Sequence, residues 1–222
     1  MAKGIGVQEF AVIGLGRFGY NLALKLEELG HSVMAIDQDE ALVQSIADRV
    51  SQSAALDATN DEALRVVDPT TFDAVIVAIG VDFEANLLIT ALLKDLGVKR
   101  IICKTQTDRQ SNILLRIGAD KVILPEKNSA ERLAEELSTP AMLERLKLGP
   151  NHSLAEVVLP SRFAHQSLAQ CNLRQQYHVM VLLIERGGGL ILAPPADAIL
   201  QAGDVLVVLG SDENVAKFSK LA

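Results

Sequence analysis

The segment Gly14-Leu15-Gly16-Arg17-Phe18-Gly19 constrains the fold of this chain more than any other part of the sequence. It follows an apolar run typical of a buried strand and opens a segment with helical spacing; the next strand ends in Asp37. A GxGxxG string alone is weak, but in this strand–turn–helix setting it predicts a Rossmann-type nucleotide-binding domain. Gly14 permits the tight turn, Gly16 lets the backbone approach a diphosphate, and Gly19 lets the helix pack on the strand.

The start of this helix should bind phosphate, because its first backbone amides have no partner within the helix. Asp37 is placed to accept hydrogen bonds from a ribose diol and would repel a 2′-phosphate, which disfavours NADP. The alternative is a strand–turn–helix unit with an empty loop. We therefore predict an adenine-nucleotide site that includes Gly14, Leu15, Gly16, Arg17, Phe18, Gly19 and Asp37.

Other segments should line the same crevice at the carboxyl ends of the strands. The candidates are Asp57, Ala58 and Thr59 after the third strand, Ala78, Ile79 and Gly80 after the fourth, and Lys104 at the end of the fifth. Ala78 and Gly80 could equally serve close packing. Arg17 could meet a terminal phosphate, in its own site or in that of a neighbouring subunit, or could be a solvated surface arginine.

Residues 9–138 alternate short apolar runs with helical patterns, which predicts a doubly wound parallel sheet with helices on both faces. We expect six strands, at Phe10–Ile13, Ser32–Ile36, Gln52–Ala55, Ala74–Ala78, Arg100–Lys104 and Lys121–Leu124. The helices between them are expected at Phe18–Leu29, Glu40–Ala47, Asp61–Val67, Phe83–Leu96 and Asp108–Ile117. A further helix is expected at Ala130–Leu137.

The rest of the chain predicts a helical linker followed by a small α+β domain. We expect Thr139-Pro140 to interrupt the preceding helix, Met142–Leu146 to resume a helical pattern, and Gly149-Pro150-Asn151 to form a turn. The expected domains are thus residues 1–138, the linker 139–150, and a β-rich domain at 151–222. Its strands are expected at Leu154–Leu159, Val179–Glu185, Leu190–Leu192 and Val205–Leu209, with a hairpin turn at Gly187–Gly189 and a closing helix at Glu213–Leu221.

Composition excludes several classes of function. The net charge of −7 argues against a nucleic-acid partner, and the apolar runs are far shorter than the roughly 20 residues of a membrane span. The two cysteines and four histidines show no disulfide framework or metal-ligand spacing, which fits a reducing cytoplasm. Because no acid–base pair or activated nucleophile stands out either, we expect a ligand sensor and not an enzyme.

Six motifs follow one another along the chain: Gly14–Gly19, Asp37, Asp57-Ala58-Thr59, Val77–Gly80, Gly118-Ala119-Asp120 and Pro125-Glu126-Lys127. In this order they resemble the RCK domains, which regulate potassium conductance, and in particular the KtrA-like regulatory subunits of Ktr-type potassium uptake systems. The likeness covers nearly the whole chain, with a TrkA-N-like half and a TrkA-C-like half beginning near residue 151.

This resemblance implies a cytoplasmic homo-oligomer, in which dimers assemble into an octameric ring at the inner face of the membrane on a KtrB-like K⁺-translocating subunit. It implies that ATP and ADP bind at Gly14–Gly19 and that Arg17 reaches the terminal phosphate from a neighbouring subunit. It also implies that Glu126 helps to hold a cation, Mg²⁺, Ca²⁺ or Na⁺, beside the nucleotide. From the residues alone, Glu126 could simply be a helix-start carboxylate.

Cyclic di-AMP and NAD(H) are two further candidate ligands. Some members of the family bind cyclic di-AMP in the C-terminal domain, but Asn172 stands where those members often carry an acid, so we leave this ligand out of the predicted site. The alternative function is an NAD(H)-binding redox sensor or a small NAD-dependent oxidoreductase.

Overall fold

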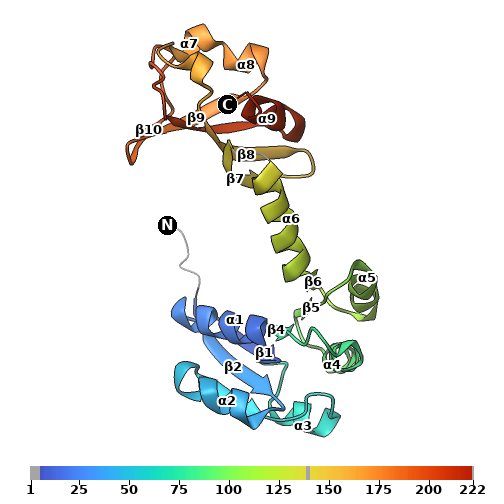
Figure 1. The fold of residues 1–222 in the computed structure, drawn as a ribbon. Coiled ribbons are helices and arrows are strands. Elements are labelled where there is room, and N and C mark those ends of the chain that lie inside the picture. The colour runs from blue at the N-terminus through green and yellow to red at the C-terminus, as the bar shows by residue number, and fades with distance from the viewer. Residues whose placement is uncertain (1–5, 139–140, 222) are drawn as a thin grey trace. The chain divides into compact units, whose positions relative to one another are not determined.

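The computed structural model of this chain describes residues 6–138 and 141–221. The chain forms two compact units, residues 1–129 and 130–222, each with its own sheet (Figure 1). The domain limits that we predicted at residues 138 and 151 stay a prediction.

The N-terminal unit is built on a six-stranded parallel sheet in the order β3-β2-β1-β4-β5-β6. The strands are β1 (Glu9–Ile13), β2 (Ser32–Asp37), β3 (Gln52–Ala55), β4 (Ala74–Val77), β5 (Ile101–Lys104) and β6 (Lys121–Ile123). Between them lie α1 (Arg17–Glu28), α2 (Glu40–Ile46), the 3₁₀ turn η1 (Ala47–Arg49), α3 (Asp61–Val66), α4 (Phe83–Asp95) and α5 (Asp108–Ile117). The predicted doubly wound Rossmann-type sheet is confirmed.

Helices cover both faces of this sheet, which explains why its central strands β1, β4 and β5 are largely apolar. Val12 of β1 points to one face and packs in a cluster with Ala23 of α1 and Val43 of α2. The next residue, Ile13, points to the other face and lies in a cluster with Leu93 of α4. The side chains of β1 thus alternate between two cores. Burial on both faces explains the position of this strand at the centre of the sheet.

The strand order reverses between β1 and β4, because β1 leads into α1 on one face and β4 leads into α4 on the other. Backbone bonds extend this pairing past the strand ends: the Ala78 amide donates to the Ile13 carbonyl at 2.7 Å. Such a switch point leaves a crevice outside the carboxyl ends of the two strands.

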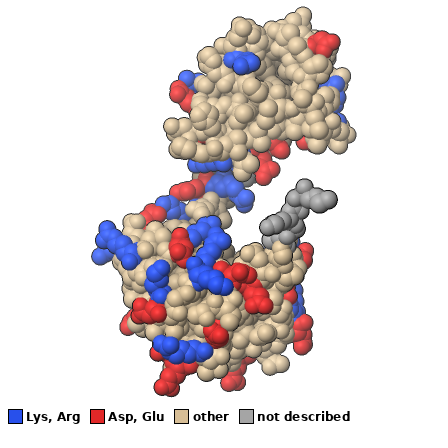
Figure 2. Space-filling model, turned by 180° about the vertical axis from the view of Figure 1, so that it is seen from behind, with Lys and Arg blue, Asp and Glu red and all other residues tan. Residues whose placement is uncertain are grey.

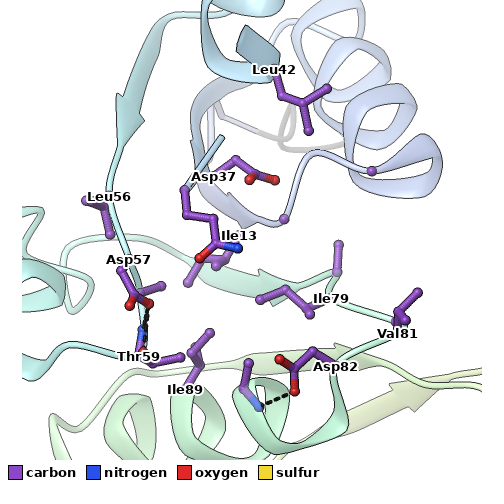
Figure 3. Close-up of a pocket in the computed structure, with 17 residues that line it drawn as sticks. Ile13, Asp37, Leu42, Leu56, Asp57, Thr59, Ile79, Val81, Asp82 and Ile89 are labelled. Carbon is purple, nitrogen blue, oxygen red and sulfur yellow. Dashed lines mark hydrogen bonds between the residues drawn. The ribbon is translucent and has the colours of Figure 1, made fainter. Parts of the chain in front are cut away.

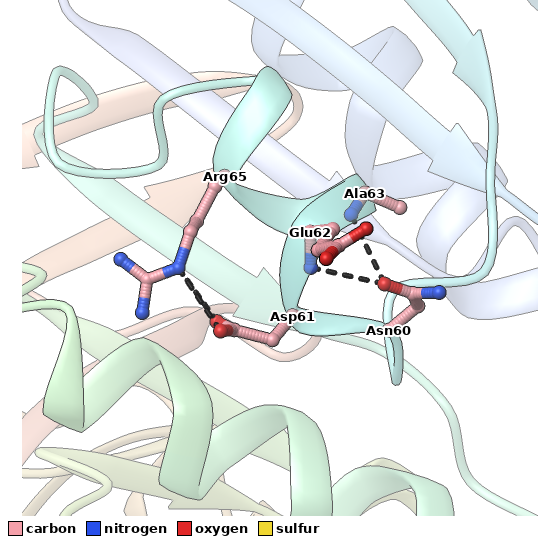
Figure 4. Close-up of polar contacts among 5 residues, drawn as sticks. All are labelled: Asn60, Asp61, Glu62, Ala63 and Arg65. Carbon is pink, nitrogen blue, oxygen red and sulfur yellow. Dashed lines mark hydrogen bonds and ion pairs between the residues drawn. The ribbon is translucent and has the colours of Figure 1, made fainter.

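The start of α3 fixes the segment that follows β3 (Figure 4). The Asn60 side chain caps the helix by accepting from the amides of Glu62 and Ala63, at 2.9 and 3.2 Å. One turn on, Arg65 pairs with Asp61 at 3.0 Å. An asparagine cap of this kind stabilises a helix by about 1 kcal/mol. The cap therefore holds the preceding residues, 57–59, at the edge of the crevice.

The C-terminal unit is a five-stranded antiparallel sheet in the order β10-β9-β11-β8-β7. Its strands are β7 (Met142–Lys147), β8 (His152–Val158), β9 (Met180–Arg186), β10 (Gly189–Leu192) and β11 (Val205–Ser211). Its short helices are η2 (Ser161–Phe163), α7 (Leu168–Cys171), α8 (Leu173–Gln176) and α9 (Asp212–Ser219). The predicted hairpin at Gly187–Gly189 joins β9 and β10. The sequence reasoning missed η2, α7 and α8.

The helix expected at Met142–Leu146 is wrong, because this segment is strand β7. Met142 and Leu146 stand four residues apart, a spacing that suits a helix, but pairing with β8 decides the outcome, with Leu146 opposite Leu154. The predicted turn at Gly149-Pro150-Asn151 lies in the connection between these two strands. Helix α6 (Pro125–Ser138) starts earlier than expected, with proline in its first turn. Thr139-Pro140 lie outside the described residues.

Candidate functional site

The glycine-rich loop between β1 and α1 is shaped by contacts that exclude side chains at two of its glycines. Gly14 has a φ of +96°, and a Cβ there would lie 2.9 Å from the Ile79 side chain. A Cβ on Gly19 would lie 1.9 Å from the Gly14 carbonyl oxygen. At Gly16, by contrast, a Cβ would meet nothing within 4 Å. Gly14 and Gly19 are therefore required for packing, whereas Gly16 faces open space at the helix start.

Asp37, at the end of β2, holds this loop in place. Its Oδ2 accepts a hydrogen bond from the Leu15 amide at 2.6 Å, and its Oδ1 accepts one from the Asp39 amide at 2.9 Å. The Leu15 side chain itself is buried, 1% exposed, in the core beside α1. Asp37 thus fixes the loop through the backbone while its carboxylate stays on the wall of the crevice.

A cavity of about 500 Å³ opens at this point, within the size range of small-molecule sites. It is lined from β1, β2, the β3–α3 segment and the β4–α4 segment (Figure 3). The lining residues are Ile13, Gly14, Gly16, Asp37, Gln38, Leu42, Leu56, Asp57, Ala58, Thr59, Ala78, Ile79, Gly80, Val81, Asp82, Ala85 and Ile89. We call it the first cavity.

Three aspartates, Asp37, Asp57 and Asp82, give the first cavity its acidic wall (Figure 3). Asp57 Oδ1 accepts from both the amide and the hydroxyl of Thr59, at 2.9 and 2.7 Å. These bonds hold the pKa of Asp57 below its usual value, and the bond from the Thr59 hydroxyl has the larger effect. Asp82 caps α4 by accepting from the Ala85 amide at 3.0 Å. Fixed carboxylates among apolar residues suit the hydroxyl and amino donors of a nucleoside.

A second cavity, of about 820 Å³, lies beside the loop and shares Gly16, Ala78, Gly80 and Val81 with the first. It is further lined by Arg17, Phe18, Asn21, Leu22, Lys104, Gln106 and Glu126. Because the shared residues are backbone-rich, a ligand that passes the glycine loop can extend from one cavity into the other.

An ion pair stands in the second cavity. Lys104 Nζ lies 2.8 Å from Glu126 Oε1. The pKa of Glu126 is lowered, chiefly by this bond with Lys104 and to a smaller extent by the charge of Arg17. Glu126 lies in the first turn of α6, so the helix start also favours its charged form. The cavity therefore brings together two cations and one carboxylate.

A buried amide links the ends of the two strands that flank this ion pair. Asn86 of α4 is 1% exposed and donates through Nδ2 to the carbonyls of Ile79 and Lys104, both at 2.8 Å. Thr90, also buried, donates to the Asn86 carbonyl at 2.7 Å. Buried polar groups bonded in this way fix a single arrangement of the chain. The ends of β4 and β5 are thus held together next to Gly80.

The structure brings most of the predicted site residues to these two cavities. Leu15 and Gly19 line neither one, since both are buried in the packing of α1. Sequence reasoning missed Gln38, Leu42, Asp82 and Gln106, among others. Asp82 and Gln106 could have been found from their places in the segments that follow β4 and β5, whereas Leu42 reaches the site only through the packing of α2.

The described residues hold neither a metal-ligand cluster nor a membrane-spanning helix. Across residues 6–138 and 141–221 there is no group of three or more His, Cys, Asp and Glu side chains that could hold a metal ion. In the same ranges, no helix has both the length and the apolar character needed to cross a membrane.

The chain matches two family profiles, the TrkA-N domain over residues 10–125 and the TrkA-C domain over residues 154–222. It is 39% identical to Ktr system potassium uptake protein C of Bacillus subtilis (strain 168), over 96% of both chains. It is 35% identical to Ktr system potassium uptake protein A of Vibrio alginolyticus, over 95% of this chain and 96% of the relative. The two profile matches begin in the first strand, at residue 10, and end at residue 222.

Among solved structures, the chain is similar to the GsuK RCK domain, with a TM-score of 0.65 and 16% identity. This likeness covers 99% of the present chain and 48% of the GsuK chain. The GsuK channel bound to NAD gives a TM-score of 0.65 and 16% identity, over 99% and 40% of the two chains. At this level of identity the likeness establishes the fold alone.

Proposed function

This chain belongs to the family of TrkA-N and TrkA-C domain proteins, and we propose that it is the nucleotide-sensing regulatory subunit of a Ktr-type potassium uptake system. Its near relatives are named for potassium uptake and match it over almost their full length. The function proposed here is binding of ATP and ADP, with the bound nucleotide setting the activity of a KtrB-like membrane subunit. Catalysis is not part of this proposal.

The observation that carries the proposal is the loop at Gly16, which faces open space while Asp37 holds the neighbouring amide. We place the diphosphate of the nucleotide at the start of α1, where Gly16 lets it approach the backbone. The ribose and adenine then occupy the first cavity, beside Asp37 and the Asp57–Thr59 segment. The proposed contacts are those of Gly14, Gly16, Asp37, Asp57, Ala58, Thr59, Ala78, Ile79 and Gly80, all of which line this cavity.

The terminal phosphate is what distinguishes ATP from ADP, and we place it in the second cavity with Arg17, Phe18 and Lys104. A guanidinium and an ammonium both bind phosphate through charge-assisted hydrogen bonds. A ligand changes a conformational equilibrium only through its difference in affinity for the two states. A ring that binds ATP more tightly in one shape is therefore driven towards that shape, without hydrolysis.

Glu126 is proposed as one ligand of a cation beside the phosphates. A lone carboxylate is a poor site for Mg²⁺ or Ca²⁺, because these ions need six or more oxygen ligands. Within the described residues no carboxylate cluster completes the set. A bound cation would take its remaining ligands from phosphate oxygens, water and a second subunit, and would neutralise the phosphates.

Assembly with further copies of the chain is the second part of the proposal. On helix α6, Leu133 and Leu137 share one face and are 52% and 72% exposed. On the C-terminal sheet, Leu146 and Met180 belong to one row of the outer face and are 59% and 42% exposed. Figure 2 shows few charged side chains on one face of this unit. Exposed apolar surface of this kind favours protein contacts, and we propose dimers that assemble into an octameric ring.

An NAD(H) sensor is the alternative function. Asp37 can accept from the diol of an NAD ribose as well as from that of ATP, and the GsuK channel, which has the same fold, is described as bound to NAD. For either function we propose a location in the cytoplasm. As a regulatory subunit, the protein would lie at the inner face of the membrane, bound to its membrane partner.

Titration calorimetry of the purified chain with ATP, ADP, NAD and NADH separates these functions. Tight binding of ATP and ADP with weak binding of NAD and NADH supports the regulatory subunit. The reverse order supports the redox sensor. A mass measurement in solution tests the assembly, and a strictly monomeric chain would contradict the ring.

A further inference from the structure

Lys104 is an almost buried cation close to Phe18 of the glycine-rich loop. Its side chain is 11% exposed, and its Nζ lies 5.9 Å from the centre of the Phe18 ring. A Cβ on Gly80 would lie 2.9 Å from the same nitrogen, so the lysine fills space that a side chain at residue 80 would take. Its own carbonyl is held by Asn86. This cation therefore lies in a nearly enclosed position next to Gly80 and Phe18.

Glu126, the counter-ion of Lys104, lies in a much more exposed position. Glu126 is 65% exposed, while its oxygen lies 2.8 Å from Lys104 Nζ. A buried ammonium without an anion is costly, whereas an exposed carboxylate that loses its partner is hydrated at little cost. Lys104 therefore needs an anion at all times, but that anion need not be Glu126.

We propose that Lys104 exchanges counter-ions, with Glu126 as its partner in the nucleotide-free chain and a nucleotide phosphate as its partner in the bound chain. The inference rests on the proposed function, since it assigns Lys104 and Glu126 their parts in the same nucleotide site. Because Glu126 is paired with the ammonium group that the phosphate must reach, it opposes nucleotide binding. Once displaced, its carboxylate is free to bind a cation beside the phosphates.

The exchange makes Glu126 act in opposite directions in the absence and presence of a divalent cation. Without one, Glu126 only competes with phosphate for Lys104. With one, the released carboxylate gains a new positive partner, which favours the bound state. Phosphate binding and cation binding are thereby coupled, and each must strengthen the other by the same factor.

Calorimetric titration with ADP in EDTA tests the competition. Glu126→Gln should bind ADP about 2- to 5-fold more tightly than the wild-type chain, the range expected when one partly exposed ion pair no longer has to be broken. The matched control is Asp108→Asn, which removes the same charge from another carboxylate paired with a lysine, Lys127 at 2.7 Å, outside both cavities. This control should bind ADP like the wild type. In MgCl₂ the advantage of Glu126→Gln should disappear.

Lys104→Met supplies a second measurement. It should lose ADP affinity by about tenfold or more, while adenosine, which carries no phosphate, should bind as it does to the wild type. A merely structural role would weaken both ligands together. Thermal unfolding of each variant checks that it folds, and if Lys104→Met does not, the Glu126→Gln comparison still decides.

Two results overturn the exchange while leaving the proposed function intact. One is an unchanged or weaker ADP affinity of Glu126→Gln in EDTA. The other is an equal gain in Asp108→Asn, which would make the effect one of overall charge. If the wild-type chain binds no adenine nucleotide at all, the proposed function fails, and the exchange fails with it.

Discussion

Two glycines of the same loop should respond to alanine in opposite ways. In Gly19→Ala the new methyl would lie 1.9 Å from the Gly14 carbonyl oxygen and 3.0 Å from the Ala78 Cβ. The first contact is with backbone, so helix α1 or the loop must move. Overpacking typically costs about 1–3 kcal/mol, and here it exceeds the gain of up to about 1 kcal/mol from replacing a helical glycine.

Gly16→Ala meets no such obstacle. Its Cβ would lie in open space, and its φ of −61° and ψ of 179° are allowed for alanine. Because Gly16 is the N-cap of α1, the substitution should cost less than about 1 kcal/mol. The methyl would, however, stand where a diphosphate must approach the backbone, so ADP affinity should fall by about tenfold or more.

Thermal unfolding and ADP calorimetry on both variants separate these effects. Gly19→Ala should unfold several degrees lower than the wild type, at roughly 3 °C per kcal/mol for a chain of this size. Gly16→Ala should unfold near the wild-type temperature and yet bind ADP about tenfold or more weakly. A Gly16→Ala chain with wild-type ADP affinity would refute the placement of the phosphates, and a Gly19→Ala chain as stable as the wild type would refute the packing argument.

Three further outcomes follow from the same geometry. Arg17→Ala should reduce the preference for ATP over ADP by about 3- to 10-fold in calorimetry, and an equal loss for both nucleotides would exclude a terminal-phosphate role. Asp37→Asn should weaken adenosine itself by about tenfold, because the ribose contact and the bond to the Leu15 amide both lose a charged acceptor; unchanged adenosine affinity would contradict this. In the C-terminal unit, the hydrogen bonds of Arg186 hold the pKa of buried Asp204 below its usual value. The charged form of Asp204 therefore stabilises the folded chain. This contribution is complete above about pH 4 and is lost as the pH falls through the folded-state pKa. Asp204→Asn should therefore lower the unfolding temperature at neutral pH and flatten its decline in acid.

The proposed nucleotide site combines rigid groups with one group that we propose to be exchangeable. Asp37, Asn86 and the glycine loop are fixed by hydrogen bonds and close packing. Glu126, by contrast, is largely exposed and pairs with Lys104 at 2.8 Å. Rigid groups can position the nucleoside, which ATP and ADP share, while the exchangeable group responds to phosphate, in which they differ. Such a division suits a protein that reports which nucleotide is bound.

The sequence by itself determined the N-terminal sheet, because short apolar runs alternate with helical patterns and each helix between them has its own start and end residues. The bounds of α5, Asp108–Ile117, agree with the prediction residue for residue. The same patterns located the glycine loop and Asp37, since a strand, a glycine-rich turn, a helix and a strand that ends in an acid follow one another in the sequence.

Only the tertiary structure decided what depends on distant partners. Segment Met142–Lys147 is compatible with a helix when read alone and becomes a strand because β8 pairs with it. Lys104 and Glu126 stand 22 positions apart in the sequence, and nothing local indicates that their charges meet at 2.8 Å. The joining of two cavities at Gly80 likewise arises only when the ends of β1, β4 and β5 are brought to one edge of the sheet. Local patterns fix elements, whereas pairing and burial between remote segments fix the site.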